Sequence, residues 1–142
     1  MAGMKFGYKE FPLSQVDVFG RKKIYRPIIP VLIEYGGKKI GYEALLDSGA
    51  DWNLFPAVLG EIIGIDIEKG KKLLFGGIGG GDFMAYFHEI ALYVGGWPIK
   101  ILCGFSADIP RKSNGVLGHF GFFDHFAVRL ETSKQEVELK KI

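Results

Sequence analysis

Residues 46–52 of this 142-residue chain read LDSGADW, and no other stretch is as informative about the fold. An apolar run ends at Asp47, which is followed by a small hydroxyl residue, Ser48, and by Gly49. An Asp-Ser-Gly tripeptide alone is a common turn sequence, because Asp and Ser bond to nearby backbone and Gly supplies a positive φ. The tripeptide occurs once in the chain, so its surroundings must decide whether it is more than a turn.

A glycine-rich segment follows downstream. Residues 73–81 read LLFGGIGGG, and a second apolar stretch occupies residues 83–93. We expect two strands joined by a glycine-rich tip with Ile78 at its centre. Glycines let a backbone approach a ligand closely and give a lid its hinge. The alternative is a hairpin loop without a function. A phosphate-binding loop is disfavoured, because no Gly-Lys-Ser/Thr follows the glycines.

Two further patterns complete the set. Residues 114–120 read NGVLGHF, in which two apolar residues precede Gly118. Residues 31–37 read VLIEYGG and residues 90–96 read IALYVGG. Both of the latter predict hairpins with Gly-Gly turns, which suit the turn types that connect antiparallel strands. The chain therefore shows a faint internal repeat.

Taken together, these motifs resemble those of the retropepsins, the retroviral-type aspartic proteases. That family carries Asp-Thr/Ser-Gly after two apolar residues, then a flap with a Gly-Gly-Ile-Gly-Gly tip, then a hydrophobic-hydrophobic-Gly element. The three motifs occur here in that order. The resemblance implies an all-β, closed β-barrel-like acid-protease fold with one or two short helices, built from a duplicated half. Because the reaction needs two carboxylates and the motif occurs once, it also implies a homodimer.

The resemblance implies a role for each matching residue. Asp47, Ser48 and Gly49 would form the catalytic loop, with one Asp47 from each subunit activating a water between them. Asp51 would contact the substrate backbone. In the family this aspartate also pairs with an arginine, but the corresponding residue here is His119, which puts the associated dimer contacts in doubt. The expected substrate-binding residues are Asp51, Trp52, Gly76, Gly77, Ile78, Gly79, Val116 and Leu117.

The predicted function is thus that of an aspartic endopeptidase acting on a peptide or protein in an extended conformation. The alternative is a non-catalytic module of the same fold that dimerises or binds peptides. Apolar residues around the site (Ile78, Ile109, Val116 and Leu117) predict a preference for apolar side chains near the cut. Trp52 could line a substrate pocket or belong to the core, and the sequence does not decide between the two.

Composition excludes several other classes. The net charge is +2 with the two signs interspersed, so the chain has no basic stripe for nucleic acid. The spacing of His88, His119, His125 and Asp124 fits no zinc pattern, and we expect neither metal nor cofactor. The single cysteine, Cys103, lies in an apolar stretch and is expected to be buried. No membrane span or signal peptide is visible, which predicts a soluble, cytoplasmic protein unless it is excised from a longer precursor.

The expected organisation is a single domain over residues 1–142 with its core in residues 25–131. Short strands with turn signals predominate, and residues 56–63 are the clearest helix, starting at a proline and ending before Gly64. A second short helix is expected at 120–126, although Gly121 weakens it. Residues 131–141 alternate charged and apolar positions, which fits either a solvated edge strand or a strand in the dimer interface.

Overall fold

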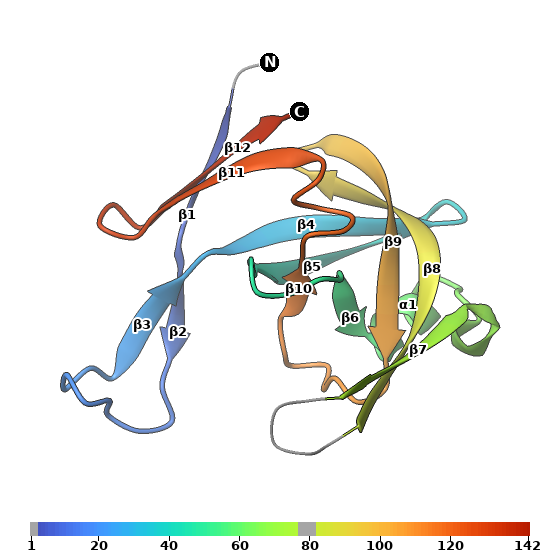
Figure 1. Cartoon of the computed structure of the whole chain (residues 1–142), viewed down its shortest axis with the longest axis horizontal. Helices are drawn as coiled ribbons and strands as arrows, with labels where there is room; N and C mark the ends of the chain where they lie inside the picture. The colour runs from blue at the N-terminus through green and yellow to red at the C-terminus, as the bar shows by residue number, and fades with distance from the viewer. Residues whose placement is uncertain (1–2, 77–81) are drawn as a thin grey trace.

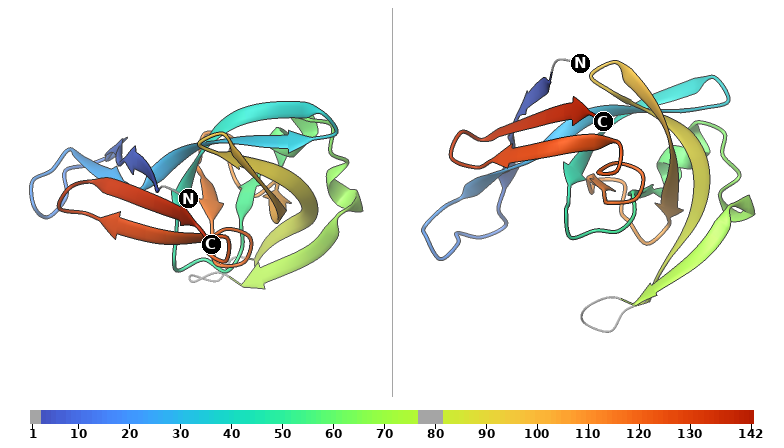
Figure 2. Two further views of the ribbon diagram at one scale, coloured as in Figure 1. Left: turned by 90° about the horizontal axis from the view of Figure 1, so that it is seen from above. Right: turned by 45° about the horizontal axis from the view of Figure 1, so that its top comes forward.

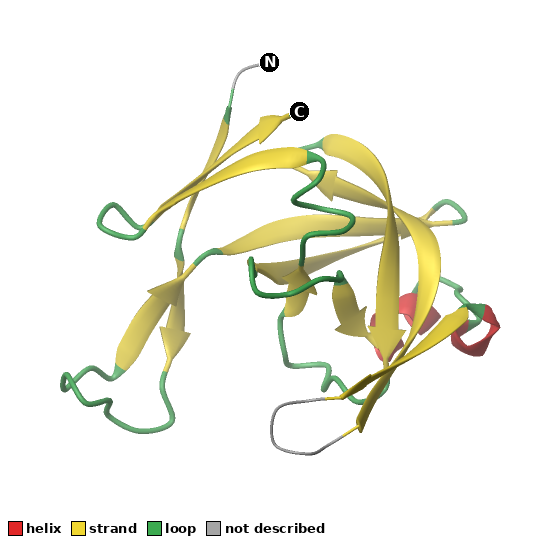
Figure 3. Ribbon diagram, in the orientation of Figure 1, coloured by secondary structure: helices red, strands yellow, loops and turns green. Residues whose placement is uncertain are grey.

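The computed structural model describes residues 3–76 and 82–142 of the chain. Strands dominate these residues, with one short α-helix and one turn of 3₁₀-helix (Figures 1 and 3). The elements are β1 (Met4–Gly7), β2 (Lys9–Pro12), β3 (Lys23–Arg26), β4 (Ile28–Tyr35), β5 (Lys38–Leu46), β6 (Leu54–Pro56), α1 (Ala57–Ile62), η1 (Ile67–Lys69), β7 (Lys71–Gly76), β8 (Asp82–Val94), β9 (Trp97–Ser106), β10 (Gly115–Leu117), β11 (Phe126–Glu131) and β12 (Glu136–Lys141).

The largest sheet closes on itself. Its strand order is β4-β5-β10-β6-β9-β8-β7, and an additional pairing of β4 with β8 joins its two sides into a barrel. Closure removes the free edges of the six strands in the ring. β7 lies outside the ring and pairs only with β8 among the described residues. The expected barrel-like all-β fold is therefore confirmed.

The two Gly-Gly turns have the same backbone geometry. Gly36 and Gly37 have φ values of 56° and 82°, and Gly95 and Gly96 have φ values of 56° and 80°. Two consecutive positive φ values are the condition for the type I′ turn, whose twist matches that of antiparallel strands. The first turn joins β4 to β5 and the second joins β8 to β9, as the sequence predicts.

The core fills the barrel and extends beneath the terminal strands. Alternate residues of β9 illustrate the pattern, since Ile99, Ile101 and Cys103 are buried while Lys100 and Leu102 are exposed. This two-residue period directs one face of each strand inward. The buried side chains of β12, Val137 and Leu139, belong to the same hydrophobic cluster as those of the barrel.

The first helix prediction is confirmed and the second is wrong. Helix α1 follows Pro56 and ends before Gly64, whose φ is 91°. Residues 121–125 instead form successive turns, and Gly121 has a φ of 108°, which a right-handed helix does not allow. Phe122 and Phe126 are nevertheless fully buried, so this segment contributes to the core without being helical.

Both chain ends meet in a small separate sheet of order β1-β12-β11, in which Met4 to Gly7 pair with Leu139 to Glu136. The hairpin of β2 and β3 projects from this region, away from the barrel (Figures 1 and 2). We call residues 9–26 the arm. The sequence contains no signal that separates this hairpin from the barrel strands.

Candidate active site

The loop that carries Asp47 begins where β5 ends. The Asp47 N–H donates to the Leu117 carbonyl at 3.0 Å, and the Ala50 N–H donates to the Asp47 carbonyl at 3.0 Å. A carboxylate oxygen of Asp47 also accepts the N–H of Gly49 at 2.9 Å. These bonds fix the backbone on both sides of the aspartate. Its side chain remains half-buried, while Ser48 and Gly49 are exposed.

Strand β10 threads beside this loop. It pairs in parallel with the end of β5, placing Val116 opposite Leu45 and Leu117 opposite Leu46, and in antiparallel fashion with Leu54 of β6. Because β10 lies between these two neighbours, the predicted apolar-apolar-Gly element lies directly beside the loop of Asp47. Leu117 is fully buried and Val116 is partly exposed.

Gly118 makes the closest approach between the two segments. A Cβ built on this glycine would lie 2.6 Å from the Ala50 carbonyl oxygen and 2.7 Å from that of Trp52. Both are backbone atoms, which cannot rotate away as a side chain could. The absence of a side chain at Gly118 is therefore what allows the loop and β10 to pack together.

Asn53 is a structural residue of the site that sequence reasoning missed. It is fully buried, and its Oδ1 accepts the N–H of Gly118 at 2.9 Å. Its amide nitrogen donates to the carbonyls of Leu102, at 3.3 Å, and Phe120, at 3.4 Å. One side chain thus joins the end of the Asp47 loop to β9 and to the segment after β10. An amide inside the apolar run at residues 52–55 is the signal that could have identified it.

Comparison with known proteins identifies the fold that carries this loop. No protein-family model and no curated protein matches the sequence. A retropepsin-like aspartic protease from Rickettsia conorii superposes with a TM-score of 0.62 at 15% identity, covering 97% of this chain and 89% of that chain. This chain has the retropepsin fold. An EIAV protease complexed with the inhibitor HBY-793 matches 66% of this chain and 82% of its own, with 25% identity and a TM-score of 0.49.

His119 contacts the loop of Asp47, but not through the bond to Asp51 that an arginine at this position is expected to make. Its backbone N–H donates to the Ala50 carbonyl at 2.9 Å. Its ring Nε2 lies 2.5 Å from the Ser48 carbonyl oxygen, and because a carbonyl can only accept, Nε2 is the donor. Among the described residues, no hydrogen bond joins this ring to the Asp51 carboxylate. Asp51 itself is exposed.

Trp52 belongs to a row of aromatic rings that leads from the loop of Asp47 to strands β7 and β8. Its ring centroid lies 5.4 Å from that of Phe120 and 5.9 Å from that of Phe87. Phe75 of β7 then lies 6.4 Å from Phe87 and 5.6 Å from Phe83. Trp52 is half-buried and borders a cavity of about 270 Å³ with Leu102 and Phe120. It is therefore neither a core residue nor a fully exposed one.

The predicted flap corresponds to β7 and β8. These strands pair from Lys71 with Phe87 to Gly76 with Asp82, so Gly76 is the last described residue of β7. The other predicted flap residues, Gly77, Ile78 and Gly79, lie outside the described residues. At its base, Met84 of β8 donates its N–H to the Asp108 carboxylate at 3.0 Å, and its carbonyl accepts the Ser106 hydroxyl at 2.5 Å.

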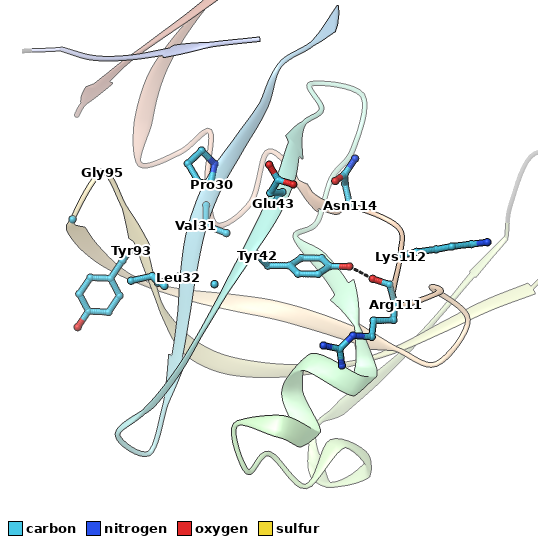
Figure 4. Close-up of a pocket in the computed structure, with 12 residues that line it drawn as sticks. Pro30, Val31, Leu32, Tyr42, Glu43, Tyr93, Gly95, Arg111, Lys112 and Asn114 are labelled. Carbon is cyan, nitrogen blue, oxygen red and sulfur yellow. Dashed lines mark hydrogen bonds between the residues drawn. The ribbon is translucent and has the colours of Figure 1, made fainter. Parts of the chain in front are cut away.

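A larger cavity, of about 710 Å³, lies elsewhere and contains none of the predicted site residues. It is bordered by β4, β5 and the loop at residues 111–114 (Figure 4). The Tyr42 hydroxyl donates to the carbonyls of Arg111 and Ser113 and so fastens this loop to β5. Burial raises the pKa of this phenol above its ordinary value. We assign the cavity no part in the chemistry, because the described residues that border it form no catalytic pattern.

Two other expectations concern metals and membranes. Within residues 3–76 and 82–142, no group of three or more His, Cys, Asp and Glu side chains is arranged to hold a metal ion. In the same part of the chain, no helix has the length and apolar character needed to cross a bilayer.

Proposed function

We propose that this protein is an aspartic endopeptidase whose active site is shared by two copies of the chain. The observation that carries the proposal is the loop at residues 47–53, in which Asp47 is held at the end of β5 by Leu117 of the adjacent β10. The same loop leaves Ser48, Gly49 and Asp51 exposed. The retropepsin fold of the chain supports this assignment.

The chemistry requires a second carboxylate, and a second copy supplies it. Two Asp47 side chains facing each other across a two-fold axis cannot both ionise easily, so the pair holds one proton and titrates as a unit. A proton shared between two aspartates is the general arrangement of aspartic proteases, and we apply it to Asp47 by resemblance. Ser48 of each copy would bond across the axis and keep the two loops in register.

The reaction follows from this arrangement. The ionised Asp47 takes a proton from a water molecule, whose oxygen attacks the carbonyl carbon of the scissile peptide bond. The protonated Asp47 of the other copy donates its proton to the carbonyl oxygen. The resulting diol then collapses, a proton passes to the amide nitrogen, and the C–N bond breaks to give a carboxylic acid and an amine. Acid-base steps of this kind each contribute roughly 10²–10⁴-fold to the rate.

Substrate would bind as an extended strand between the catalytic loop and the flap. Gly49 and the flap residues Gly76, Gly77, Ile78 and Gly79 would present backbone to it, and Asp51 would bond to its backbone. Val116 and Trp52, which are partly exposed, would line the side-chain pockets, and the fully buried Leu117 would support them from the core. The aromatic row from Trp52 to Phe75 supports a preference for large apolar side chains near the cut.

Cleavage of a pooled peptide library between pH 4 and pH 7 tests this function, with Asp47→Asn as the matched isosteric control. We expect cleavage that disappears in the variant and whose specific activity rises with protein concentration. A wild-type dimer that binds peptides without cutting them would favour the non-catalytic alternative. Cleavage that survives in Asp47→Asn would contradict the assignment of Asp47.

A further inference from the structure

Among the described residues, the arm, residues 9–26, contributes no side chain to the hydrophobic core. Its two strands pair from Lys9 with Arg26 to Pro12 with Lys23. Its charged contact with the barrel is the ion pair between Lys9 and Glu43. An isolated two-stranded hairpin is marginally stable in water at best, so an arm that projects this way is expected to be stabilised by something it binds.

The tip of the arm is rigidly built. One carboxylate oxygen of Asp17 accepts the N–H groups of Phe19, at 2.9 Å, and Arg21, at 2.8 Å, and the other pairs with the Arg21 guanidinium at 2.7 Å. The Gly20 N–H donates to the Asp17 carbonyl at 3.0 Å. Four contacts to one residue thus fix the conformation of the turn.

This rigid turn displays apolar side chains to water. Val18 is 94% exposed and Phe19 is 77% exposed, and Val16 nearby is 55% exposed. Single exposed apolar residues are ordinary, but three on one ordered tip form a compact apolar anchor of the kind that protein interfaces bury. The Arg21 guanidinium lies over the Phe19 ring, 4.9 Å from its centroid, and restricts the ring further.

Charge and position indicate what the anchor binds. The arm carries five basic and two acidic side chains, a net charge of +3, so the remainder of the chain, whose total is +2, carries −1. A second copy therefore offers the arm a body of opposite sign. The arm also extends from the side of the barrel on which the loop between β5 and β6 lies (Figures 1 and 2). A second copy must approach from this side for its Asp47 to meet the first.

We propose that the arm clasps the second copy of the chain, with Val18 and Phe19 packed against the partner's body. The proposal rests on the proposed function, which requires two copies at one site. Each copy contributes one arm, so the contact occurs twice around the two-fold axis. The arm strengthens the dimer without contributing any atom to the reaction.

The test compares Val18→Ser/Phe19→Ser with Ile62→Ser, which removes a 47%-exposed apolar side chain from α1, on the far side of the barrel from the arm (Figure 1). Sedimentation equilibrium measures the dimer dissociation constant of each protein. We expect the arm variant to raise it at least about tenfold, the effect of losing a modest interface anchor, and Ile62→Ser to leave it unchanged. Circular dichroism on the monomers checks that both variants are folded.

The outcomes separate the two proposals. At concentrations that keep every protein dimeric, the arm variant should cleave peptides at the wild-type rate. An arm variant that dimerises as tightly as wild type overturns the arm proposal and leaves the protease proposal standing. Weaker peptide binding with unchanged dimerisation also overturns it, by making the arm a substrate contact. A wild-type chain that stays monomeric at all concentrations overturns both.

Discussion

At the scale of single residues, Gly118 controls the geometry of the site more directly than any residue that bears a functional group. Its Cα lies against the backbone of the catalytic loop, and its N–H is fixed by the buried amide of Asn53. A side chain at this position would overlap the backbone atoms of Ala50 and Trp52. The loop must shift to accommodate it, and small displacements of reacting groups lower catalytic rates steeply.

We therefore predict that Gly118→Ala lowers kcat/KM at least about tenfold while the chain still folds. Gly41→Ala is the matched control, since a Cβ at Gly41 of β5 would meet only the Leu32 side chain, at 3.6 Å. Peptide cleavage and thermal unfolding of both variants provide the measurements. Equal activities of the two variants would contradict the view that Gly118 sets the position of the loop.

The Cys103 thiol is a second residue whose behaviour follows from its surroundings. It is fully buried, and burial raises the pKa of the thiol well above its ordinary value. The reactive thiolate is therefore suppressed in the folded chain. At pH 8, an aromatic disulfide reagent should label the urea-unfolded protein within minutes and the native protein only at the rate of unfolding. Rapid labelling of the native protein would contradict the buried position of Cys103.

At the scale of elements, the base of the proposed flap is held by side chains at the end of β9 and in the loop that follows it. The β8–β9 ladder ends with Tyr86 opposite Phe105, and beyond it Ser106 and Asp108 satisfy the two backbone groups of Met84. These side chains continue the ladder where the backbone of β9 has turned away. The described part of β8 is therefore tied to β9 and to the loop that follows it as far as Met84.

Replacing Asp108 with Ala should weaken the attachment of Met84 to the loop after β9. The Met84 amide loses its acceptor, and a lost hydrogen bond of about 1 kcal/mol corresponds to an acceleration of its exchange with solvent by about fivefold. Hydrogen–deuterium exchange of residues 83–86 measures the change. Glu89→Ala is the control, because Glu89 also lies on β8 but is exposed and pairs with Lys100. Exchange at Met84 that does not change would contradict the view that Asp108 holds this part of β8.

The elements of the barrel were predictable from sequence because their signals are local. Gly-Gly turns, a proline before α1 and alternating apolar residues each act over a few positions. The arm and the turns at 121–125 were not predictable on this basis. The arm looks like any other hairpin in sequence. The phenylalanines at 122 and 126 have a helical spacing, but Gly121, with a φ of 108°, interrupts the predicted helix at its second residue. The motif locates Asp47, whereas the role of Asn53 depends on three partners distant in sequence.

At the scale of the whole molecule, the chain holds one Asp-Ser-Gly loop in a fold that exposes it. The barrel fixes the loop, β7 and β8 form the strands of the proposed flap, and the arm extends on the side where the proposed second copy would lie (Figure 1). Under the proposed function, a single chain supplies half of the catalytic carboxylates, so activity requires the pair.

Mixing wild-type protein with Asp47→Asn tests this central claim most directly. The two forms are combined in varying ratio at a fixed total concentration high enough to keep them paired, with exchange of subunits allowed to reach equilibrium. If both carboxylates are needed, activity should fall as the square of the wild-type fraction, to about a quarter at equal mixing. A linear fall, to about a half at the same point, would contradict the account by showing that each chain cuts peptides with its own site.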